Sequence, residues 1–372
     1  MKYIKLFKTT AEYEAYIADV ENFIVPNVSL CKDTNFTYHH KHLPEIDYSK
    51  EYFTIEALED GLTVQLSQNA SEYRIDSGEW ISLSSNTATP SINSGQKISF
   101  KMTNSTISTD YGGIGTFNVN KAFNVEGNIM SLLYGDNFDG QINLSRNPHV
   151  FYQLFYNCTT LKNAENLILP ATTLATWCYS RMFYGCTSLT SAPELPATKL
   201  EGYCYGMMFR KCTSLTTAPE LPATTLTTYC YGNMFEGCTS LTTAPELPAT
   251  RLASECYQNM FYGCSKLNYI KMLATDISAS GCLYNWTTGV ASTGTFVKHP
   301  QMTSLPSGYS GIPIGWTVEN EGTSTSNTIV ETDETSISIL SNVEISEDSI
   351  SINGENIKIE NDENNNYNII IE

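Results

Sequence analysis

Two series of cysteines are the residues of this chain whose type and spacing most resemble a chemical site. They recur every 26 residues, as Cys178, Cys204, Cys230, Cys256 and Cys282, and as Cys186, Cys212, Cys238 and Cys264. Zinc sites are built from closely spaced cysteines and histidines. Here the two series are eight residues apart, and the stretch contains no Cys-x-x-Cys and no histidine. The pattern therefore predicts small thiols stacked in a core, with no metal and no cofactor. An odd total of eleven cysteines favours reduced thiols.

Other polar groups offer little catalytic chemistry. The cluster His39–His42 lacks a second set of ligands, so we interpret it as a solvated loop. The segment Asp76–Trp80 resembles a sialidase-type Asp box but is one residue short and occurs once, which favours a hairpin turn followed by a buried tryptophan. No nucleophile elbow, HExxH or Cys/His signature is present, and we predict no catalytic residue. An acidic row in register marks an outer face: Glu194, Glu220 and Glu246.

The cysteines belong to an internal repeat of 26 residues. The units are MFYGCTSLTSAPELPATKLEGYCYGM, MFRKCTSLTTAPELPATTLTTYCYGN and MFEGCTSLTTAPELPATRLASECYQN, followed by a partial unit. Leucine, cysteine and methionine spaced four apart from Leu226 to Cys238 predict a short helical turn, and Leu241–Leu247 predicts a short strand ended by Pro248. One helix-like and one strand-like segment per unit is typical of a leucine-rich-repeat solenoid, here over residues 151–282.

The repeats resemble the BspA-like leucine-rich repeats, whose kernel is present as Met234–Leu241 and at the matching places of the other units. Such proteins are typically cell-surface adhesins. The opening segments Phe7–Tyr16 and Pro26–Ser29 resemble a lead-in found on many proteins of Bacteroides and of their crAss-like bacteriophages. The resemblance implies a repeat surface that adheres to a protein or to a host glycan.

Positions that differ between units, inside a constant core pattern, indicate a solvent-facing surface. An aromatic row on such a surface offers platforms for sugar rings or a protein partner. The alternative is that the tyrosines only cover the edges of the coils. The predicted binding residues are Trp177, Tyr179, Tyr203, Tyr205, Tyr229, Tyr231, Tyr257, Arg210, Glu236 and Arg251.

The segments before the array predict an N-terminal docking module and a small β-sandwich. A capping box at Thr9 and Glu12 predicts a helix over residues 10–20, within a module of residues 1–50. Residues 51–110 alternate as strands between turn residues, and 111–150 form a glycine- and asparagine-rich lead-in and cap. The expected strands are Tyr52–Ala57, Leu62–Leu66, Glu72–Ile75, Glu79–Leu83 and Lys97–Met102.

The segments after the array predict a closing cap over 283–320, a linker over 321–334 and a β module over 335–372. In the β module, isoleucine or valine alternates with other residues on both sides of Asn353–Gly354, which predicts a hairpin. Its isoleucine face needs another chain or domain to cover it. We therefore expect an assembly or tip module that forms a homo-oligomer, a dimer or a trimer.

Composition narrows both the fold class and the function classes. Only 16% of residues are charged, and the polarity comes mainly from Thr, Ser, Asn, Gly and Tyr, which predicts a mainly β protein. The net charge is −18 and basic clusters are few, which excludes nucleic acid as a partner. The sequence has no run of 18 apolar residues, so we expect no insertion into a membrane. Lys2, Lys5 and Lys8 interrupt any signal-peptide core, so we expect assembly in a cytoplasm. The first hypothesis is a bacteriophage virion protein, a head or tail fibre or decoration that docks on other virion proteins. The alternatives are a bacterial surface adhesin and, third, a glycan-active enzyme.

Overall fold

The computed structural model describes residues 48–67, 71–102 and 113–321 in full, and after residue 330 the backbone of six strands. Residues 46–324 form one compact unit, and the strands after residue 330 belong to a second. The predicted helix over 10–20 and the cluster His39–His42 lie outside the described residues. The described part is mainly β, as predicted. Its helical elements are α2 (Ser131–Tyr134) and two single 3-10 turns, η1 (Tyr48–Lys50) and η2 (Gly135–Asn137).

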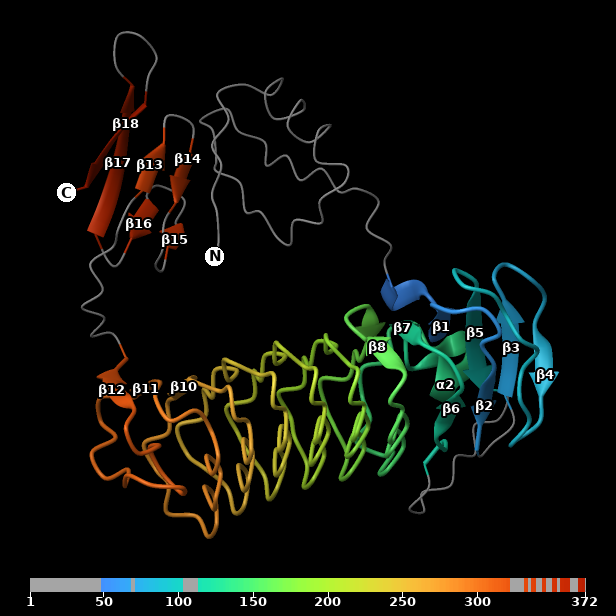
Figure 1. Cartoon of the computed structure of the whole chain (residues 1–372), viewed down its shortest axis with the longest axis horizontal. Coiled ribbons are helices and arrows are strands. Elements are labelled where there is room, and N and C mark those ends of the chain that lie inside the picture. Colours follow the sequence, from blue (N-terminus) through green and yellow to red (C-terminus); the bar gives the residue numbers. More distant parts are fainter. Residues whose placement is uncertain are drawn as a thin grey trace. The chain divides into compact units, whose positions relative to one another are not determined.

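The first part of the compact unit is a sheet with strand order β4-β3-β5-β1-β7-β8, in which β9 also pairs with β7 (Figure 1). A separate two-stranded ribbon pairs β2 with β6. All five strands predicted between residues 52 and 102 are present. The bounds are β1 Thr54–Ala57, β2 Val64–Leu66, β3 Ser71–Ile75, β4 Ile81–Leu83, β5 Lys97–Met102, β6 Phe117–Val119, β7 Phe123–Asn128, β8 Leu161–Asn163 and β9 Leu167–Ile168.

This sheet crosses the boundary predicted at residue 110. Strand β1 pairs antiparallel with β5 on one side and with β7 on the other, so residues after 110 complete the same sheet. Strand β7 pairs in parallel with β8, which belongs to the repeat region. The sheet therefore continues into the first repeat, and the two share one hydrophobic core.

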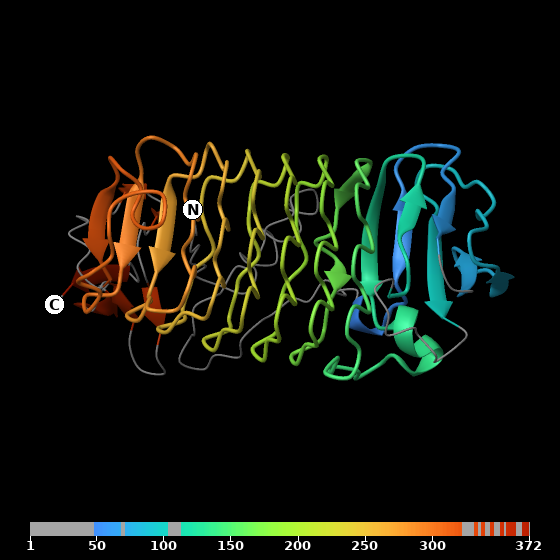
Figure 2. The same cartoon turned by 90° about the horizontal axis from the view of Figure 1, so that it is seen from below.

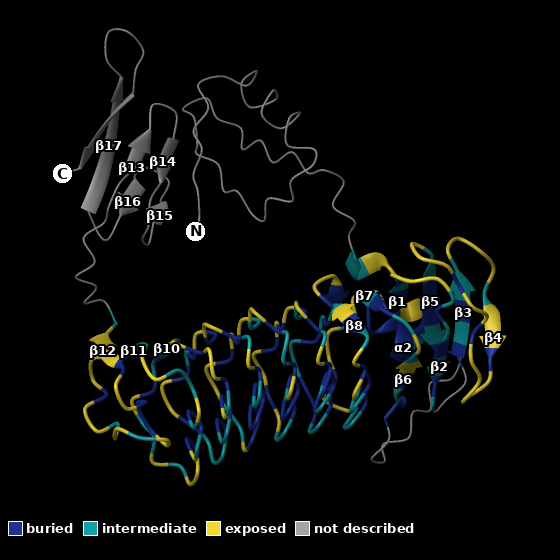
Figure 3. Ribbon diagram, in the orientation of Figure 1, coloured by how far each residue is buried: buried dark blue, intermediate teal, exposed yellow. Residues whose placement is uncertain are grey.

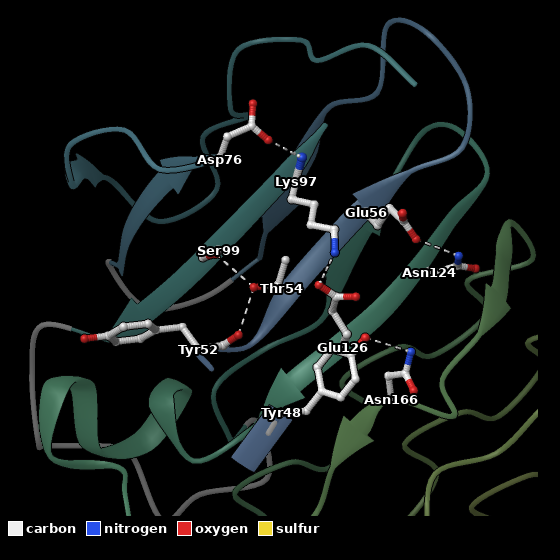
Figure 4. A network of polar contacts seen from close by, with 10 residues as sticks. All are labelled: Tyr48, Tyr52, Thr54, Glu56, Asp76, Lys97, Ser99, Asn124, Glu126 and Asn166. Carbon is white, nitrogen blue, oxygen red and sulfur yellow. Dashed lines mark hydrogen bonds and ion pairs between the residues drawn. The ribbon is translucent and has the colours of Figure 1, made fainter. Parts of the chain in front are cut away.

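Polar side chains tie the central strands together (Figure 4). The ammonium of Lys97 lies 2.6 Å from a carboxylate oxygen of Glu126, which joins β5 to β7 across β1. The amide of Asn124 donates to Glu56 at 2.9 Å. At the predicted turn after β3, the backbone N–H of Gly78 donates to Ile75 at 2.9 Å, and Asp76 has a φ of 51°. The turn is confirmed at this place.

The repeat region is a stack of similar coils (Figures 1 and 2). Equivalent residues are 28 apart between the first and second coils, as Phe155 and Phe183 are, and 26 apart in the coils that follow. Backbone hydrogen bonds alternate between local and coil-to-coil partners. The N–H of Cys178 donates to Ala175 three residues earlier, whereas the N–H of Tyr179 donates to Cys204 in the next coil at 3.0 Å. The alternation runs from Trp177 to Gly185 and recurs at the matching positions of the other coils. The predicted helical turn is therefore wrong, because an α-helix would bond every amide to a carbonyl four residues earlier.

The four-residue spacing that suggested a helix has another cause. Every fourth residue has a left-handed backbone, as at Trp177 (φ 63°), Arg181 (φ 56°) and Gly185 (φ 74°). The chain thus turns in steps of four, which brings side chains four apart to the same side of the coil. In an α-helix the same spacing arises from 3.6 residues per turn, and the two periods cannot be distinguished over so short a segment.

The predicted strand Leu241–Leu247 is reduced to two isolated parallel bridges, Thr243 to Tyr269 and Leu247 to Met272. Pro245 lies between the two bridges. Proline has no N–H to donate to a neighbouring strand, and a proline therefore interrupts a ladder. Regular strands form only in the first and last coils.

The interior of the stack is filled by columns of aromatic rings in register. The phenylalanine column stacks at 5.4–5.9 Å between centroids: Phe155, Phe183, Phe209, Phe235 and Phe261. At its first end Phe155 meets Phe117 of the sheet, 5.7 Å away. At its other end Trp286 contacts both this column and the tyrosine column described below. Figure 3 shows buried residues along the inner side of every coil.

The array ends in a parallel sheet of β10 (Tyr269–Met272), β11 (Thr295–Lys298) and β12 (Thr317–Asn320). Trp286 and Trp316, both within the predicted cap over 283–320, are buried here. The indole N–H of Trp286 donates to the carbonyl of Gly311 at 2.9 Å, and that of Trp316 donates to Ala291 at 2.8 Å.

The second compact unit contains a hairpin of β13 and β14 and an antiparallel sheet of β15 to β18. Strand β13 falls inside the segment predicted to be a linker. Strands β16 and β17 pair around Asn353–Gly354, which confirms the predicted hairpin. The bounds are β13 Glu331–Asp333, β14 Ser336–Ser338, β15 Val343–Ile345, β16 Ile350–Ile352, β17 Glu355–Asn361 and β18 Tyr367–Ile371.

Candidate binding surface

Four of the predicted binding residues are inside the molecule. Tyr179, Tyr205, Tyr231 and Tyr257 are at most 1 % exposed and form a second stacked column beside the phenylalanines. The prediction that they form a solvent-facing row is wrong. Each of them lies two residues after a left-handed position, as Tyr179 does after Trp177, and at this place in the coil the side chain points inward. Burial raises the pKa of these phenols well above its usual value, so they stay protonated.

The neighbouring aromatic row does lie at the edge of the coils. Trp177 and Tyr203 are half-buried, and Tyr229 is buried at the border of the core. The rings of Trp177 and Tyr203 stack at 4.2 Å, and those of Tyr203 and Tyr229 at 4.8 Å. Because these rings cover one another's faces, a sugar ring cannot stack between them. This row presents ring edges and hydroxyl groups to the solvent. The geometry fits the second interpretation of the sequence, in which the tyrosines cover the edges of the coils.

Beside that row, two guanidinium groups flank one sulfur atom. Nε of Arg181 lies 3.4 Å from Sδ of Met207, and Nη1 of Arg210 lies 4.0 Å from the same sulfur. The Nη1 group of Arg181 also donates to the hydroxyl of Tyr152 at 2.9 Å. Two like charges are thus held close together by side chains from three successive coils.

A third cation joins this cluster over the ring of Tyr184. The guanidinium carbon of Arg210 is 5.6 Å from the ring centroid, and Nζ of Lys211 is 5.7 Å from it. The ring of Tyr156, in the preceding coil, stacks on Tyr184 at 5.0 Å. Since the cations come from the following coil, we place them over the opposite ring face. Such contacts stabilise a cation without neutralising its charge.

One carboxylate balances part of this charge. Glu236 pairs with Arg210 at 2.7 Å and accepts a hydrogen bond from the amide of Asn233, whose own oxygen accepts from the hydroxyl of Tyr229. Burial, the largest cause, raises the pKa of Tyr229 to about 12. Neither Arg181 nor Lys211 forms an ion pair with any residue that the structure describes. We call Arg181, Arg210 and Lys211, with Tyr152, Tyr184 and Met207, the cationic cluster.

The remaining predicted site residues divide between this cluster and other places. Arg210 and Glu236 belong to it. Arg251 does not: its side chain is 82 % exposed and its Nε lies 3.3 Å from a carboxylate oxygen of Asp276. The acidic residues Glu194, Glu220 and Glu246 are exposed as predicted, and Glu246 pairs with Lys271 at 3.0 Å.

Sequence reasoning missed Arg181, Met207 and Lys211, although a signal for them exists. Left-handed positions favour glycine and asparagine. The column of Arg181 and Met207 begins with Gln153 and continues as Asn233, Asn259 and Asn285, and the column of Lys211 otherwise holds Asn157, Gly185, Gly237, Gly263 and Gly289. Large side chains at these positions differ from the residues that the other coils hold there. A comparison of the repeats that follows only their constant core residues does not find them.

The cysteines are core thiols, as predicted. All ten in the described residues are free and buried. Burial raises the pKa of Cys178 and of Cys230 to about 12, so neither is a ready nucleophile. Within the described ranges no group of three or more His, Cys, Asp or Glu residues could hold a metal ion. A helix long and apolar enough to cross a membrane is likewise not found among them.

The Asp-box-like segment ends in Trp80, which is half-buried rather than buried. The ammonium of Lys101 is 4.6 Å and the guanidinium carbon of Arg74 is 4.9 Å from its ring centroid. The ring of Tyr52 packs edge-on against it at 4.9 Å. These contacts anchor the β3–β4 hairpin on the sheet.

Comparison of the chain with protein-family models, with curated proteins and with solved structures gave no match.

Proposed function

We propose that this chain is a non-enzymatic structural protein of a bacteriophage particle, a head or tail fibre or decoration, and that residues 151–282 form a BspA-like leucine-rich-repeat solenoid. In this proposal the solenoid is a stiff spacer that carries an adhesive surface for a host glycan or protein. The N-terminal module docks on other virion proteins.

The observation that supports a spacer most strongly is the coil-to-coil bonding. In one segment of each coil, alternate amides donate to the next coil, as Phe155 does to Met182, Phe183 to Met208 and Phe209 to Met234. Each coil thus contacts only its neighbours, and ring columns run uninterrupted through all of them. Such a quasi-one-dimensional body keeps its length fixed and leaves its outer positions free to vary.

The proposed homo-oligomer is supported by the register of the C-terminal sheet. Paired residues of an antiparallel sheet share a face. The register of β15 to β18 therefore places eight aliphatic residues on one face, which also holds Glu355, Asn361 and Tyr367: Val343, Ile345, Ile350, Ile352, Ile357, Ile359, Ile369 and Ile371. A face of this kind favours packing against a second copy, a dimer or trimer contact.

The virion location rests on the resemblance of the segments Phe7–Tyr16 and Pro26–Ser29 to a lead-in found on proteins of Bacteroides and of their crAss-like bacteriophages. It is tested by mass spectrometry and antibody-labelled electron microscopy of purified particles. We expect the chain at a fixed number of copies per particle and labelled at a head or tail site. Its absence from particles, with label on intact bacterial cells instead, would refute the virion assignment and support the surface adhesin.

A further inference from the structure

The cationic cluster stands out against the charge of the rest of the chain. The array of residues 151–282 contains eight basic and eight acidic residues, whereas the whole chain has a net charge of −18. Within the array three cations lie around Met207 and Tyr184, with a single carboxylate, that of Glu236. Placing like charges side by side is unfavourable unless an anion neutralises them. The cluster is therefore suited to an anionic ligand.

The second observation is independent of charge. Arg181, Met207 and Lys211 all have left-handed backbones, with φ of 56°, 59° and 64°. Long side chains are disfavoured in this conformation, and the corresponding positions of the later coils hold asparagine or glycine. Backbone strain of this kind is stored preferentially at functional sites. Of these three residues, Arg181 and Lys211 are also the two cations of the cluster that have no carboxylate partner among the described residues.

The cluster is also held in position before any ligand arrives. Tyr152 accepts a hydrogen bond from Arg181 at 2.9 Å, and Glu236 fixes Arg210 at 2.7 Å. The Nε atom of Arg210 is buried and has no hydrogen-bond partner. A positioned guanidinium matches the two oxygens of a carboxylate or the oxygens of a sulfate.

A peptide ligand fits this surface less well. Peptides bind through free strand edges or through pockets for apolar anchors. The amides of Arg181 and Lys211 already donate to Gly206 and Glu236 of the following coils. The large exposed hydrophobic residues of the described chain lie elsewhere, and in the array only Tyr262 is among them. The cluster instead offers cations, tyrosine hydroxyls and ring edges, which match charged and hydroxyl groups.

We infer that the cationic cluster, formed by side chains between residues 152 and 211, binds the carboxylate or sulfate groups of an acidic polysaccharide. This inference rests on the proposed adhesive function, for which it names the ligand class and the site. Successive coils present Tyr152, Arg181 and then Arg210 with Lys211, so an extended chain of charged sugars can lie along the stack.

The experiment uses the full-length chain and measures its affinity for three immobilised polysaccharides: polygalacturonate, dextran sulfate and neutral dextran. At about physiological ionic strength, roughly 150 mM salt, we expect binding to one or both anionic polymers and none to dextran. Lys211→Gly and Arg181→Asn restore the residues of later coils. Each should weaken binding roughly tenfold, while the midpoint of thermal unfolding stays unchanged or rises.

Lys199→Thr is the matched control, because it also removes one exposed cation in favour of the residue of the next coil, Thr225. It should leave binding unchanged. Equal losses in Lys199→Thr and Lys211→Gly would mean that net charge alone attracts the polymer, and would overturn the site. Equal affinity for poly-L-glutamate would overturn the glycan class. Lower unfolding midpoints in both cluster variants would make these residues structural. If the chain is found in virions but binds neither anionic polysaccharide, the inference is refuted and the proposed structural role is not.

Discussion

Two tyrosines two residues apart, Tyr203 and Tyr205, have opposite roles in this molecule. Tyr205 stacks in the buried column with Tyr179 and Tyr231 at 5.7 and 5.8 Å. Tyr203 stacks at the half-buried edge between Trp177 and Tyr229. The inner position is tyrosine in four successive coils, whereas the edge position holds Trp177, Tyr203 and Tyr229 and then Glu255, where the stack of rings ends. The difference teaches that a repeating residue is not assigned to the core or to the surface by its type, but by its place within a four-residue turn.

The largest expected effect is a loss of stability at high pH, caused by buried groups in the core of the coils. Burial raises the pKa of Cys158, Cys178, Cys230 and Cys264 to about 12. Above pH ~9 the unfolded chain releases protons that the native state keeps, so stability falls as pH rises toward 12. Each such thiol contributes about 1.4 kcal/mol per pH unit. Urea unfolding at pH 8, 9.5 and 10.5 should show a steep fall only above pH ~9.

Double substitution of Cys178 and Cys230 by alanine provides the control for that measurement. It should make the alkaline fall in stability shallower without changing its direction. A free energy of unfolding that is level from pH 8 to pH 10.5 would contradict the burial of these thiols.

The two tryptophans of the coils give the next largest contrast. Trp286 is fully buried and closes both inner columns, whereas Trp177 is half-buried at the edge. Trp286→Ala should lower the free energy of unfolding by about 3–5 kcal/mol. Trp177→Ala should lower the free energy of unfolding by about 1 kcal/mol, because the half-buried ring removes less apolar surface from water. Urea denaturation followed by circular dichroism distinguishes them, and similar losses would contradict the assigned burial.

A smaller contrast concerns hydroxyl groups alone. The hydroxyl of Tyr205 is buried and has no hydrogen-bond partner. An unsatisfied buried polar group is destabilising, so Tyr205→Phe should raise the free energy of unfolding by about 1 kcal/mol. Tyr203→Phe removes a hydroxyl at the edge and should change it by less than about 0.5 kcal/mol. A loss of stability in Tyr205→Phe would indicate an internal partner such as a bound water.

The sequence predicts some elements closely. The five strands from residue 52 to residue 102 match because their alternation and turn residues agree with the local conformation. The hairpin at Asn353–Gly354 follows from the same kind of signal. The thiol columns also follow, since small apolar residues at a fixed interval belong in a core.

Other features require the structure. A four-residue period suits both an α-helix and a run of left-handed turns, and only the hydrogen bonds of residues such as Tyr179 separate them. The continuation of the sheet from β7 into β8 is non-local and has no sequence signal. The cationic cluster combines Arg181 and Arg210 from different coils around Met207, a contact that depends on how neighbouring coils are aligned.

The most direct test of the central claim is to compare Tyr205→Ala with Tyr203→Ala by urea denaturation in the same buffer. The claim is that the left-handed turn repeat places one tyrosine in the core and the other at the edge. We expect Tyr205→Ala to lower the free energy of unfolding by about 3–5 kcal/mol, and Tyr203→Ala by about 1–2 kcal/mol. Equal losses, or a larger loss for Tyr203→Ala, would contradict the arrangement of the coils described above.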